Sequence, residues 1–197
     1  MTRITMLSES ARSDLEDREQ AEADLDQIYD TARELTLAVD EIVWAVNPRH
    51  DTVESLTNYL GNFAQDFLDT AGIRCRLDMP FRFPAWPLTS EARHNLFLAF
   101  KEALNNVVKH AAASEVHISL HAETDSFELT VEDNGRGFTH DHDEINLRSN
   151  SLRYASGNGL ENMRRRLTDI GGRCDIRSRP GEGTKVRFIV PVRIHVA

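Results

Sequence analysis

Apolar residues recur at steps of three and four positions through the N-terminal part of the chain. This spacing predicts an amphipathic helix whose apolar face contains Leu25, Ile28, Ala32, Leu35, Val39, Ile42 and Val46. A shorter helical stretch at residues 4–11 precedes it, and we expect the charged segment 13–19 to form the turn between them. Pro48 ends the long helix, because proline disfavours helical geometry in the residue before it. The pattern therefore predicts a helical hairpin.

This hairpin has too little apolar surface to form a core by itself. Two arrangements would bury its apolar face: packing on the globular part of the same chain, or pairing with a second copy in a four-helix bundle. The periodicity is compatible with both. Beyond Pro48, Asp51 or Thr52 can cap a third helix, which we expect to end at Gly72.

From about residue 73 the pattern changes to mixed strand and helix. Strands are predicted at 73–77, 116–122, 127–131, 173–177 and 185–191. Helical periodicity predicts helices at 90–112 and 160–170, the first with Val107 and Val108 on or near its buried side. The proline-rich segment 80–87 is expected to be irregular. Residues 139–156 are polar and lack periodicity, and such a long loop in a compact domain is typical of a lid or a binding element.

Composition and charge narrow the class of protein. With 40% hydrophobic and 28% charged residues, the chain has the composition of a soluble globular protein. Its net charge of -9 argues against nucleic-acid binding, which relies on basic surface. It has no run of about 18 apolar residues, so we expect neither a signal peptide nor a membrane span within this stretch. Cys75 and Cys174 lack metal-ligand spacing, which indicates reduced thiols in a cytosolic protein.

A first cluster of candidate chemistry lies on the helix predicted at 90–112. Glu102 and Asn106 are four residues apart, and Lys109 follows Asn106 by three. All three side chains are therefore expected to project from one side of the helix. A carboxylate, an amide oxygen and an ammonium group suit a magnesium ion and the phosphates that it bridges. The alternative is a solvated helix face with an ordinary polar pair.

Three further clusters combine glycine with polar residues at turns, and the chain has no P-loop pattern. Asp133-Asn-Gly-Arg-Gly137 follows a strand, where glycines allow close approach of a ligand and Asp133 can accept a hydrogen bond from an amine. Gly157-Asn-Gly159-Leu160 opens a helix, whose free amide groups can hold phosphate. The last, 181–184, precedes the final strand. Taken singly, each is also typical of an ordinary turn.

In order and spacing these four clusters resemble the N, G1, G2 and Gly-Thr boxes of the ATPase family that groups gyrase, Hsp90, histidine kinases and MutL. The resemblance covers about residues 73–195. It implies an α+β fold, a two-layer α/β sandwich of the histidine-kinase ATPase (Bergerat) type. Helices would cover one face of a mixed, largely antiparallel sheet, and ATP would lie between a helix and the lid.

The resemblance also implies roles for single residues. The nucleotide-binding positions would be Asn106, Lys109, His110, Asp133, Gly135, Gly137, Gly157, Gly159, Leu160 and Thr184. Asn106 would ligate Mg²⁺, with Glu102 near the metal and its waters. Lys109 and His110 would face the phosphates, which Gly157 and Gly159 would hold. Asp133 would read the adenine amine, in a base pocket lined by Gly135 and Gly137. Thr184 would support Asp133 through its hydroxyl or a water.

Residues 31–48 resemble the second helix of the dimerisation hairpin in sensor histidine kinases of the nitrate-sensor and DesK-like group. The resemblance implies a homodimer formed through the hairpin. The activity implied is transfer of the ATP γ-phosphoryl group to a histidine, and then to an aspartate of a response regulator. The expected domains are a partial dimerisation hairpin at 1–48, a connecting helix at 49–72 and the catalytic domain at 73–197. The location implied is the cytoplasm, with membrane anchoring of a longer protein left open.

The sequence departs from that group in one respect. The family's phosphoacceptor histidine precedes the stretch that matches residues 4–8, whereas the first histidine here is His50, beyond Pro48. We therefore expect that the chain starts just after the acceptor site, and that it binds ATP·Mg but does not phosphorylate itself. Two alternatives stay open: a serine kinase of the anti-sigma-factor type, and a nucleotide-gated dimerisation module without phosphotransfer. His140 and His142 are expected to lie in a solvated lid and not in a metal site.

Overall fold

A computed structural model describes residues 5–6, 8, 20–29, 31–32, 35, 44, 51–80, 86–139 and 158–192. The chain divides into two compact units, Met1–Asn47 and Pro48–Ala197. The turn predicted at 13–19, the helix end at Pro48, most of the segment 80–87 and the loop 140–157 with its two histidines lie outside the described residues. None of the helices in the described ranges is long and apolar enough to cross a bilayer.

The described residues of the first unit are helical, including all of 20–29. This agrees with the helical periodicity at those positions. Four large apolar side chains on these residues are exposed: Met6, Leu25, Tyr29 and Leu35. The apolar face predicted from the sequence is therefore not covered at Leu25 and Leu35.

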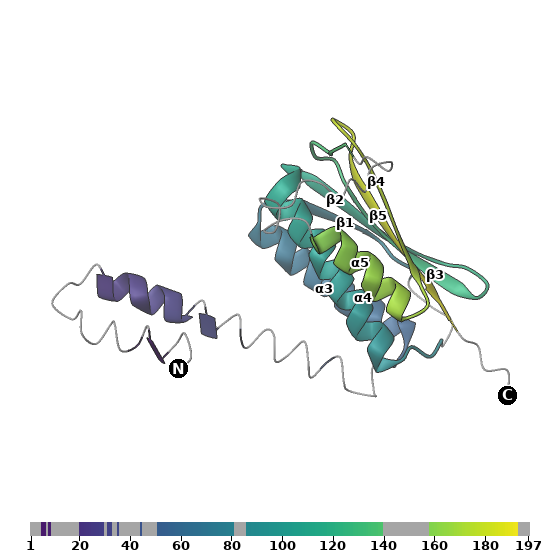
Figure 1. Cartoon of the computed structure of the whole chain (residues 1–197), viewed down its shortest axis with the longest axis horizontal. Helices are drawn as coiled ribbons and strands as arrows, with labels where there is room; N and C mark the ends of the chain where they lie inside the picture. Colours follow the sequence, from purple (N-terminus) through teal and green to yellow (C-terminus); the bar gives the residue numbers. More distant parts are fainter. Residues whose placement is uncertain are drawn as a thin grey trace, which may run out of the picture. The chain divides into compact units, whose positions relative to one another are not determined.

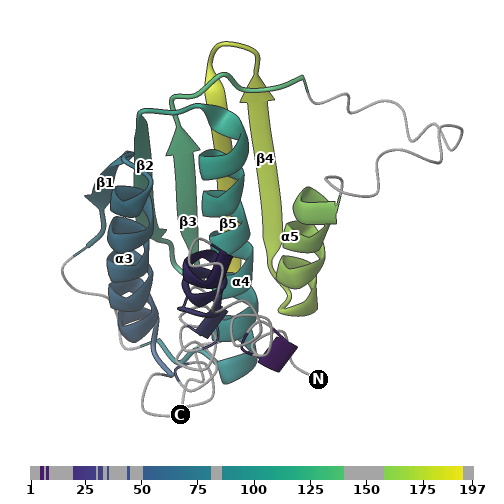
Figure 2. The ribbon, with the colours of Figure 1, turned by 90° about the vertical axis from the view of Figure 1, so that its left-hand side faces the viewer.

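The second unit is a two-layer sandwich, which confirms the predicted fold (Figure 1). Three helices cover one face of the sheet: α3 at Val53–Thr70, α4 at Ser90–Asn106 and α5 at Asn158–Asp169 (Figure 2). The strands are β1 at Arg74–Asp78, β2 at Glu115–Ala122, β3 at Ser126–Asp133, β4 at Arg173–Arg179 and β5 at Gly183–Pro191. Their order is β1-β2-β3-β5-β4, with β1 parallel to β2 and the other neighbours antiparallel.

Local sequence signals fix the helix starts. The Thr52 hydroxyl accepts the Ser55 backbone N–H at 3.2 Å and so caps α3. The Thr89 hydroxyl accepts the Ala92 backbone N–H at 3.1 Å and caps α4 in the same way. Both caps satisfy a backbone donor that has no partner within its helix.

The core lies between the helices and the sheet, where alternate residues of each strand face inward. It includes Val116, Ile118 and Leu120 of β2, Phe127, Leu129 and Val131 of β3, and Val186, Phe188 and Val190 of β5, all buried. Strand β3 runs two residues further than predicted. It therefore places Asp133 inside the sheet at its last position.

The helix predicted at 90–112 is interrupted. The α-helix α4 ends at Asn106, and Val107–Ala111 form a π-helical turn, η2, which ends at Ala112 with φ 52°. A π turn holds one extra residue, so the side chains after Asn106 leave the α-helical register. Val108 is consequently 39% exposed, and the prediction that it lies on the buried side is wrong.

Arg93 of α4 is completely buried, and it ties α4 to the segment before α3. Its Nη2 lies 2.7 Å from the Asp51 carboxylate, and Ser90 lies within hydrogen-bond distance of both. Burial lowers the pKa of Arg93, and the charge of Asp51 partly offsets this. The pair fixes the start of the helix that carries Glu102 and Asn106 further along.

The other sheet face carries charged side chains paired across strands, and helices α3, α4 and α5 all lie on the opposite face (Figures 1 and 2). Lys185 Nζ lies 2.9 Å from Glu132, and Arg187 lies 3.0 Å from Asp175. Exposed pairs of this kind contribute little to stability. They do leave this face without a large apolar patch.

Candidate functional site

A pocket of about 250 Å³ opens between the helix layer and the sheet. Its walls are mostly apolar and come from α4, η2, β3, β5 and α5: Ala103, Val107, Ala111, Val131, Phe138, Leu160, Met163 and Val186. The polar groups in the lining are those of Asn106, His110, Asp133, Arg136, Gly137 and Thr184. Six of the predicted site residues therefore share one pocket: Asn106, His110, Asp133, Gly137, Leu160 and Thr184.

Asp133 is the buried acid of the pocket, with 5% of its surface exposed. Its carboxylate accepts the Gly135 N–H at 2.8 Å and hydrogen bonds from the backbone N–H and the hydroxyl of Thr184. Burial raises the pKa of Asp133, and these three hydrogen bonds act against that rise. A carboxylate accepts about four hydrogen bonds, so one acceptor position remains for a donor in the pocket.

Glycines let the turn after β3 pack against neighbouring backbone. A β-carbon on Gly135 would overlap the Ala111 carbonyl oxygen, and one on Gly137 would overlap the Arg179 carbonyl oxygen. Gly183 is held against the Asp133 carbonyl in the same way, with φ 77°. The sequence motif suggested room for a ligand, whereas the structure shows that these glycines make room for backbone. Gly135 itself does not line the pocket.

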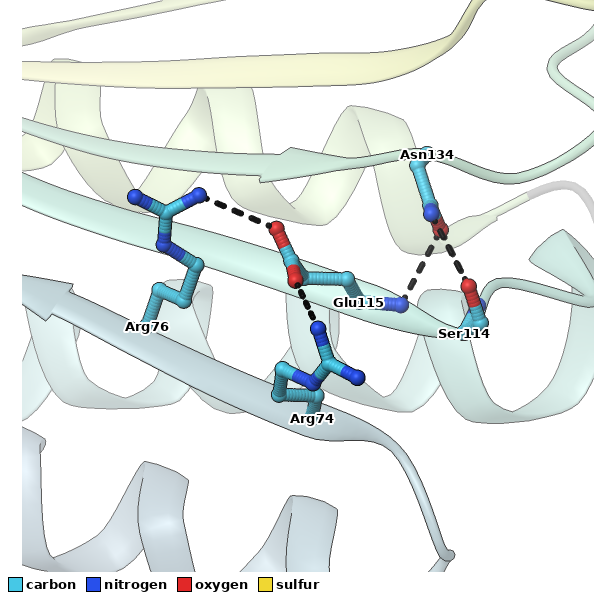
Figure 3. A network of polar contacts seen from close by, with 5 residues as sticks. All are labelled: Arg74, Arg76, Ser114, Glu115 and Asn134. Atoms are coloured by element: carbon cyan, nitrogen blue, oxygen red, sulfur yellow. Dashed lines mark hydrogen bonds and ion pairs between the residues drawn. The ribbon is translucent and has the colours of Figure 1, made fainter.

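Asn134 joins the end of β3 to the start of β2 (Figure 3). Its Oδ1 accepts the backbone N–H groups of Ser114 and Glu115, each at 3.0 Å, and its Nδ2 donates to the Ser114 hydroxyl at 2.9 Å. The Glu115 side chain in turn pairs with Arg74 and Arg76 of β1. The Asn-Gly pair is therefore not a simple hairpin turn.

Arg136 is a pocket residue that the sequence did not single out. Its Nε donates to the His110 carbonyl oxygen at 2.7 Å, and its backbone N–H donates to the Ala111 carbonyl oxygen at 2.8 Å. Its own carbonyl accepts the Gly181 N–H at 2.7 Å. A cation at the carbonyl end of a helix is favourable. Arg136 thus links η2 to the turn between β4 and β5.

The cluster predicted on one helix side is divided in the structure. Asn106 lines the pocket, and its Nδ2 is buried with no hydrogen-bond partner among the described residues. Glu102 reaches the start of α5. Its carboxyl oxygen occupies the space that a β-carbon at position 159 would need, which is free because Gly159 has no side chain. Lys109, in η2, is exposed and does not line the pocket. Gly157 lies outside the described residues.

These residues fit an adenine nucleotide. Apolar walls suit a planar base, Asp133 has one acceptor position left, and the unpartnered Asn106 amide can donate to a polar group of a ligand or to a water. Oxygen atoms of Asn106 and Glu102, one helical turn apart, are of the kind that Mg²⁺ prefers. The described part of the chain holds no group of three or more His, Cys, Asp or Glu residues that could bind a metal.

Comparisons with known proteins point to the same assignment. Residues 91–194 match the family described as histidine kinase-, DNA gyrase B-, and HSP90-like ATPase. The sensor histidine kinase LiaS of Bacillus subtilis is 30% identical over 127 residues, covering 64% of this chain and 32% of that protein. An uncharacterized sensor-like histidine kinase of Chloroflexus aurantiacus is 28% identical over 194 residues, covering 98% of this chain and 32% of that protein.

Two solved structures share the fold. The histidine kinase AdeS of Acinetobacter baumannii gives a TM-score of 0.58 at 15% identity, covering 98% of this chain and 96% of that one. The histidine kinase domain of a blue-light activated kinase of Erythrobacter litoralis gives 0.56 at 19% identity, covering 96% and 94%. The chain spans about a third or less of the length of the curated relatives it matches. Since the family match extends over more than half of its residues, the chain belongs to the histidine kinase-, DNA gyrase B- and HSP90-like ATPases.

Proposed function

We propose that this chain is the nucleotide-binding catalytic region of a two-component sensor histidine kinase. It binds ATP with Mg²⁺ and transfers the γ-phosphoryl group to a histidine nitrogen, from which the group passes to an aspartate of a response regulator. The observation that carries the proposal is the buried Asp133 carboxylate, which has an acceptor position left in an apolar pocket that the unpartnered amide of Asn106 also lines. The sensor histidine kinases among the relatives support the kinase assignment.

The base would bind through its amine. Asp133 accepts the hydrogen bond from the exocyclic amine of adenine, and Thr184 holds the carboxylate in position through its hydroxyl and N–H. The apolar walls, among them Val107 and Met163, bury the ring. An acceptor-only group discriminates against a base that presents a carbonyl oxygen at the same position.

The phosphates would lie toward the N-terminus of α5. The first turn of α5, with Gly159 and Leu160, supplies backbone N–H groups there, and His110 and Lys109 add hydrogen-bond donors and charge. Asn106 and Glu102 hold the magnesium ion, which supplies neutralisation of the charge that develops on the phosphates. Glu102 lies beside Gly159 at the start of α5, where the phosphates would bind.

Partners follow from the same proposal. The exposed Leu25, Tyr29 and Leu35 support pairing of the hairpin with that of a second copy, which would cover them. The expected partners are thus a homodimer mate and a response regulator, and the expected location is the cytoplasm. The domain limits at 48 and 72 remain part of the proposal.

Calorimetric titration with ADP and ATP, with and without Mg²⁺, tests the binding site. We expect Asp133→Ala to abolish measurable binding. Glu132→Ala is the matched control, because Glu132 is the preceding residue and pairs with Lys185 on the opposite face of the sheet. Equal binding by wild type and the Asp133 variant would overturn the site.

The phosphotransfer claim needs a separate test. This chain, incubated alone with γ-labelled ATP, is expected to form no acid-labile phosphohistidine, because no histidine precedes His50. Label on a histidine of this chain contradicts the predicted absence of the acceptor. Acid-stable label on a serine would favour the serine kinase alternative.

A further inference from the structure

Three polar residues lie side by side on three adjacent strands at the pocket. Asp133 of β3 is the register partner of Thr184 of β5, and Thr184 is the register partner of Ser178 of β4. The hydroxyl oxygens of Ser178 and Thr184 lie 3.0 Å apart. Ser178 is separated from Asp133 by one strand and does not line the pocket.

The hydrogen atoms of these groups can be assigned by counting. Thr184 has one hydroxyl hydrogen, and it goes to the Asp133 carboxylate, since a hydrogen bond to an ionised group is about twice as strong as a neutral one. We therefore assign Ser178 as the donor in its contact with Thr184. Its single hydrogen has two acceptors within reach, the Thr184 hydroxyl oxygen and the Gly183 carbonyl oxygen, each at 3.0 Å, and its own oxygen accepts the Phe138 N–H at 2.9 Å.

We infer that Ser178 is a positioning residue for adenine recognition, acting through Thr184. This inference rests on the proposed function. When Ser178 donates to the Thr184 hydroxyl oxygen, the Thr184 hydroxyl hydrogen cannot point back at Ser178. The hydroxyl is therefore oriented toward the Asp133 carboxylate. Donation to Thr184 also polarises that hydroxyl and strengthens its bond to the carboxylate. Through the Phe138 N–H, Ser178 holds the turn after β3 at the same time.

Removal of the Ser178 hydroxyl should therefore affect the amine contact selectively. Ser178→Ala is expected to weaken ADP binding about three- to ten-fold, the range that loss of one hydrogen bond of ordinary strength produces. Binding of the purine riboside diphosphate that lacks the 6-amino group should fall less, because it loses only the effect on Phe138 and not the effect on the amine contact. Ser178→Thr, which keeps the hydroxyl, should restore ADP binding. Arg177→Ala, on the same strand but on the opposite face, is the matched control and should leave both affinities unchanged.

A double-mutant cycle shows whether Ser178 acts through Thr184. In the Thr184→Val background the additional Ser178→Ala change should weaken ADP binding less than it does in wild type. In Ser178→Ala the hydrogen bond from the Thr184 hydroxyl to the Asp133 carboxylate should be weaker, so the ionised form of Asp133 is less favoured. The pH below which ADP binding is lost should therefore be higher in this variant than in wild type. If Ser178→Ala does not fold, Ser178→Cys keeps the volume with a weaker donor and should shift binding in the same direction.

The inference is overturned if Ser178→Ala binds ADP as wild type does, if it weakens both ligands equally, or if its effect adds in full to that of Thr184→Val. The proposed function fails separately. Wild type that does not bind ADP, or Asp133→Ala that binds it normally, overturns both. If Asp133→Ala loses ADP binding while Ser178→Ala binds ADP as wild type does, only the positioning role of Ser178 is overturned.

Discussion

Arg136 Nε donates to the carbonyl oxygen of His110 at 2.7 Å, which joins the turn after β3 to the end of the π-helical turn. The two residues are far apart in the chain, and both line the pocket. The contact therefore fixes the irregular end of the helix at the point where the pocket opens.

Loss of this contact should weaken nucleotide binding. Arg136→Ala leaves the His110 carbonyl without its side-chain donor, so we expect η2 to loosen and ADP affinity to fall about three- to ten-fold. Calorimetric titration measures the change. Arg165→Ala is the control, since Arg165 is exposed on α5 and bonds only to Asn162 among the described residues. An Arg136 variant with wild-type affinity would show that η2 holds its shape without this bond.

The raised pKa of Asp133 predicts two pH dependences of opposite sign. Burial raises the pKa, so the folded protein favours the protonated acid more than the unfolded chain does. The free energy of unfolding without nucleotide should therefore fall as the pH rises through the pKa of Asp133. Nucleotide affinity should rise over the same range, because the ionised carboxylate is the better acceptor for the amine.

Asp133→Asn should remove both dependences. Thermal unfolding and ADP titration between about pH 4 and 8, each compared between wild type and this variant, isolate the contribution of the single carboxyl group. Parallel curves for the two proteins would contradict the assignment of the pH effect to Asp133.

The buried ion pair of Arg93 and Asp51 predicts a large loss of stability when it is broken. Asp51→Asn leaves a guanidinium that is 0% exposed without its carboxylate, and should lower the free energy of unfolding by about 3 kcal/mol. Urea denaturation gives the value. Combining it with Arg93→Met should recover part of the loss, because the uncompensated charge is gone. Arg74→Ala, which removes an exposed pair with Glu115, should cost less than about 1 kcal/mol.

The two cysteines should differ in reactivity. Burial raises the pKa of Cys174 to about 12, and Cys174 is buried, whereas Cys75 is partly exposed with a pKa raised by burial to a smaller extent. Only the thiolate attacks disulfide reagents. In the native protein at mildly alkaline pH, Cys75 should react first, and Cys75→Ser should remove the fast phase. Both thiols should react once the protein is unfolded, which provides the control.

Much of the fold follows from local signals in the sequence. Thr52 and Thr89 begin helices because each has a hydroxyl placed to accept a backbone N–H, and alternation in the strands selects the inward face. The four glycine and polar clusters likewise mark the segments that meet at the pocket. These features depend on residues close together in the chain, so they can be predicted without the tertiary structure.

The remaining features depend on contacts between distant segments. The π turn at Val107–Ala111 is hydrogen-bonded to Arg136. The apolar spacing along the helix carries no information about that contact. Arg93 is a charged residue within a helix pattern, and its burial is accompanied by the ion pair with Asp51, which lies far from it in the chain. The proposed role of Ser178 depends on the strand order, because β5 lies between β3 and β4 and so places Thr184 between Asp133 and Ser178. No local pattern in the sequence indicates any of these three features.

The sheet order also has a consequence for synthesis. The buried Asp133 carboxylate obtains two of its hydrogen bonds from Thr184, which belongs to the last strand of the sheet. A nascent chain that has emerged from the ribosome only as far as α5 already contains the acid of the pocket and its Gly135 donor, but not Thr184. Nucleotide binding therefore favours polypeptides whose β4–β5 hairpin is in place, and it would mark the completion of this sheet during translation.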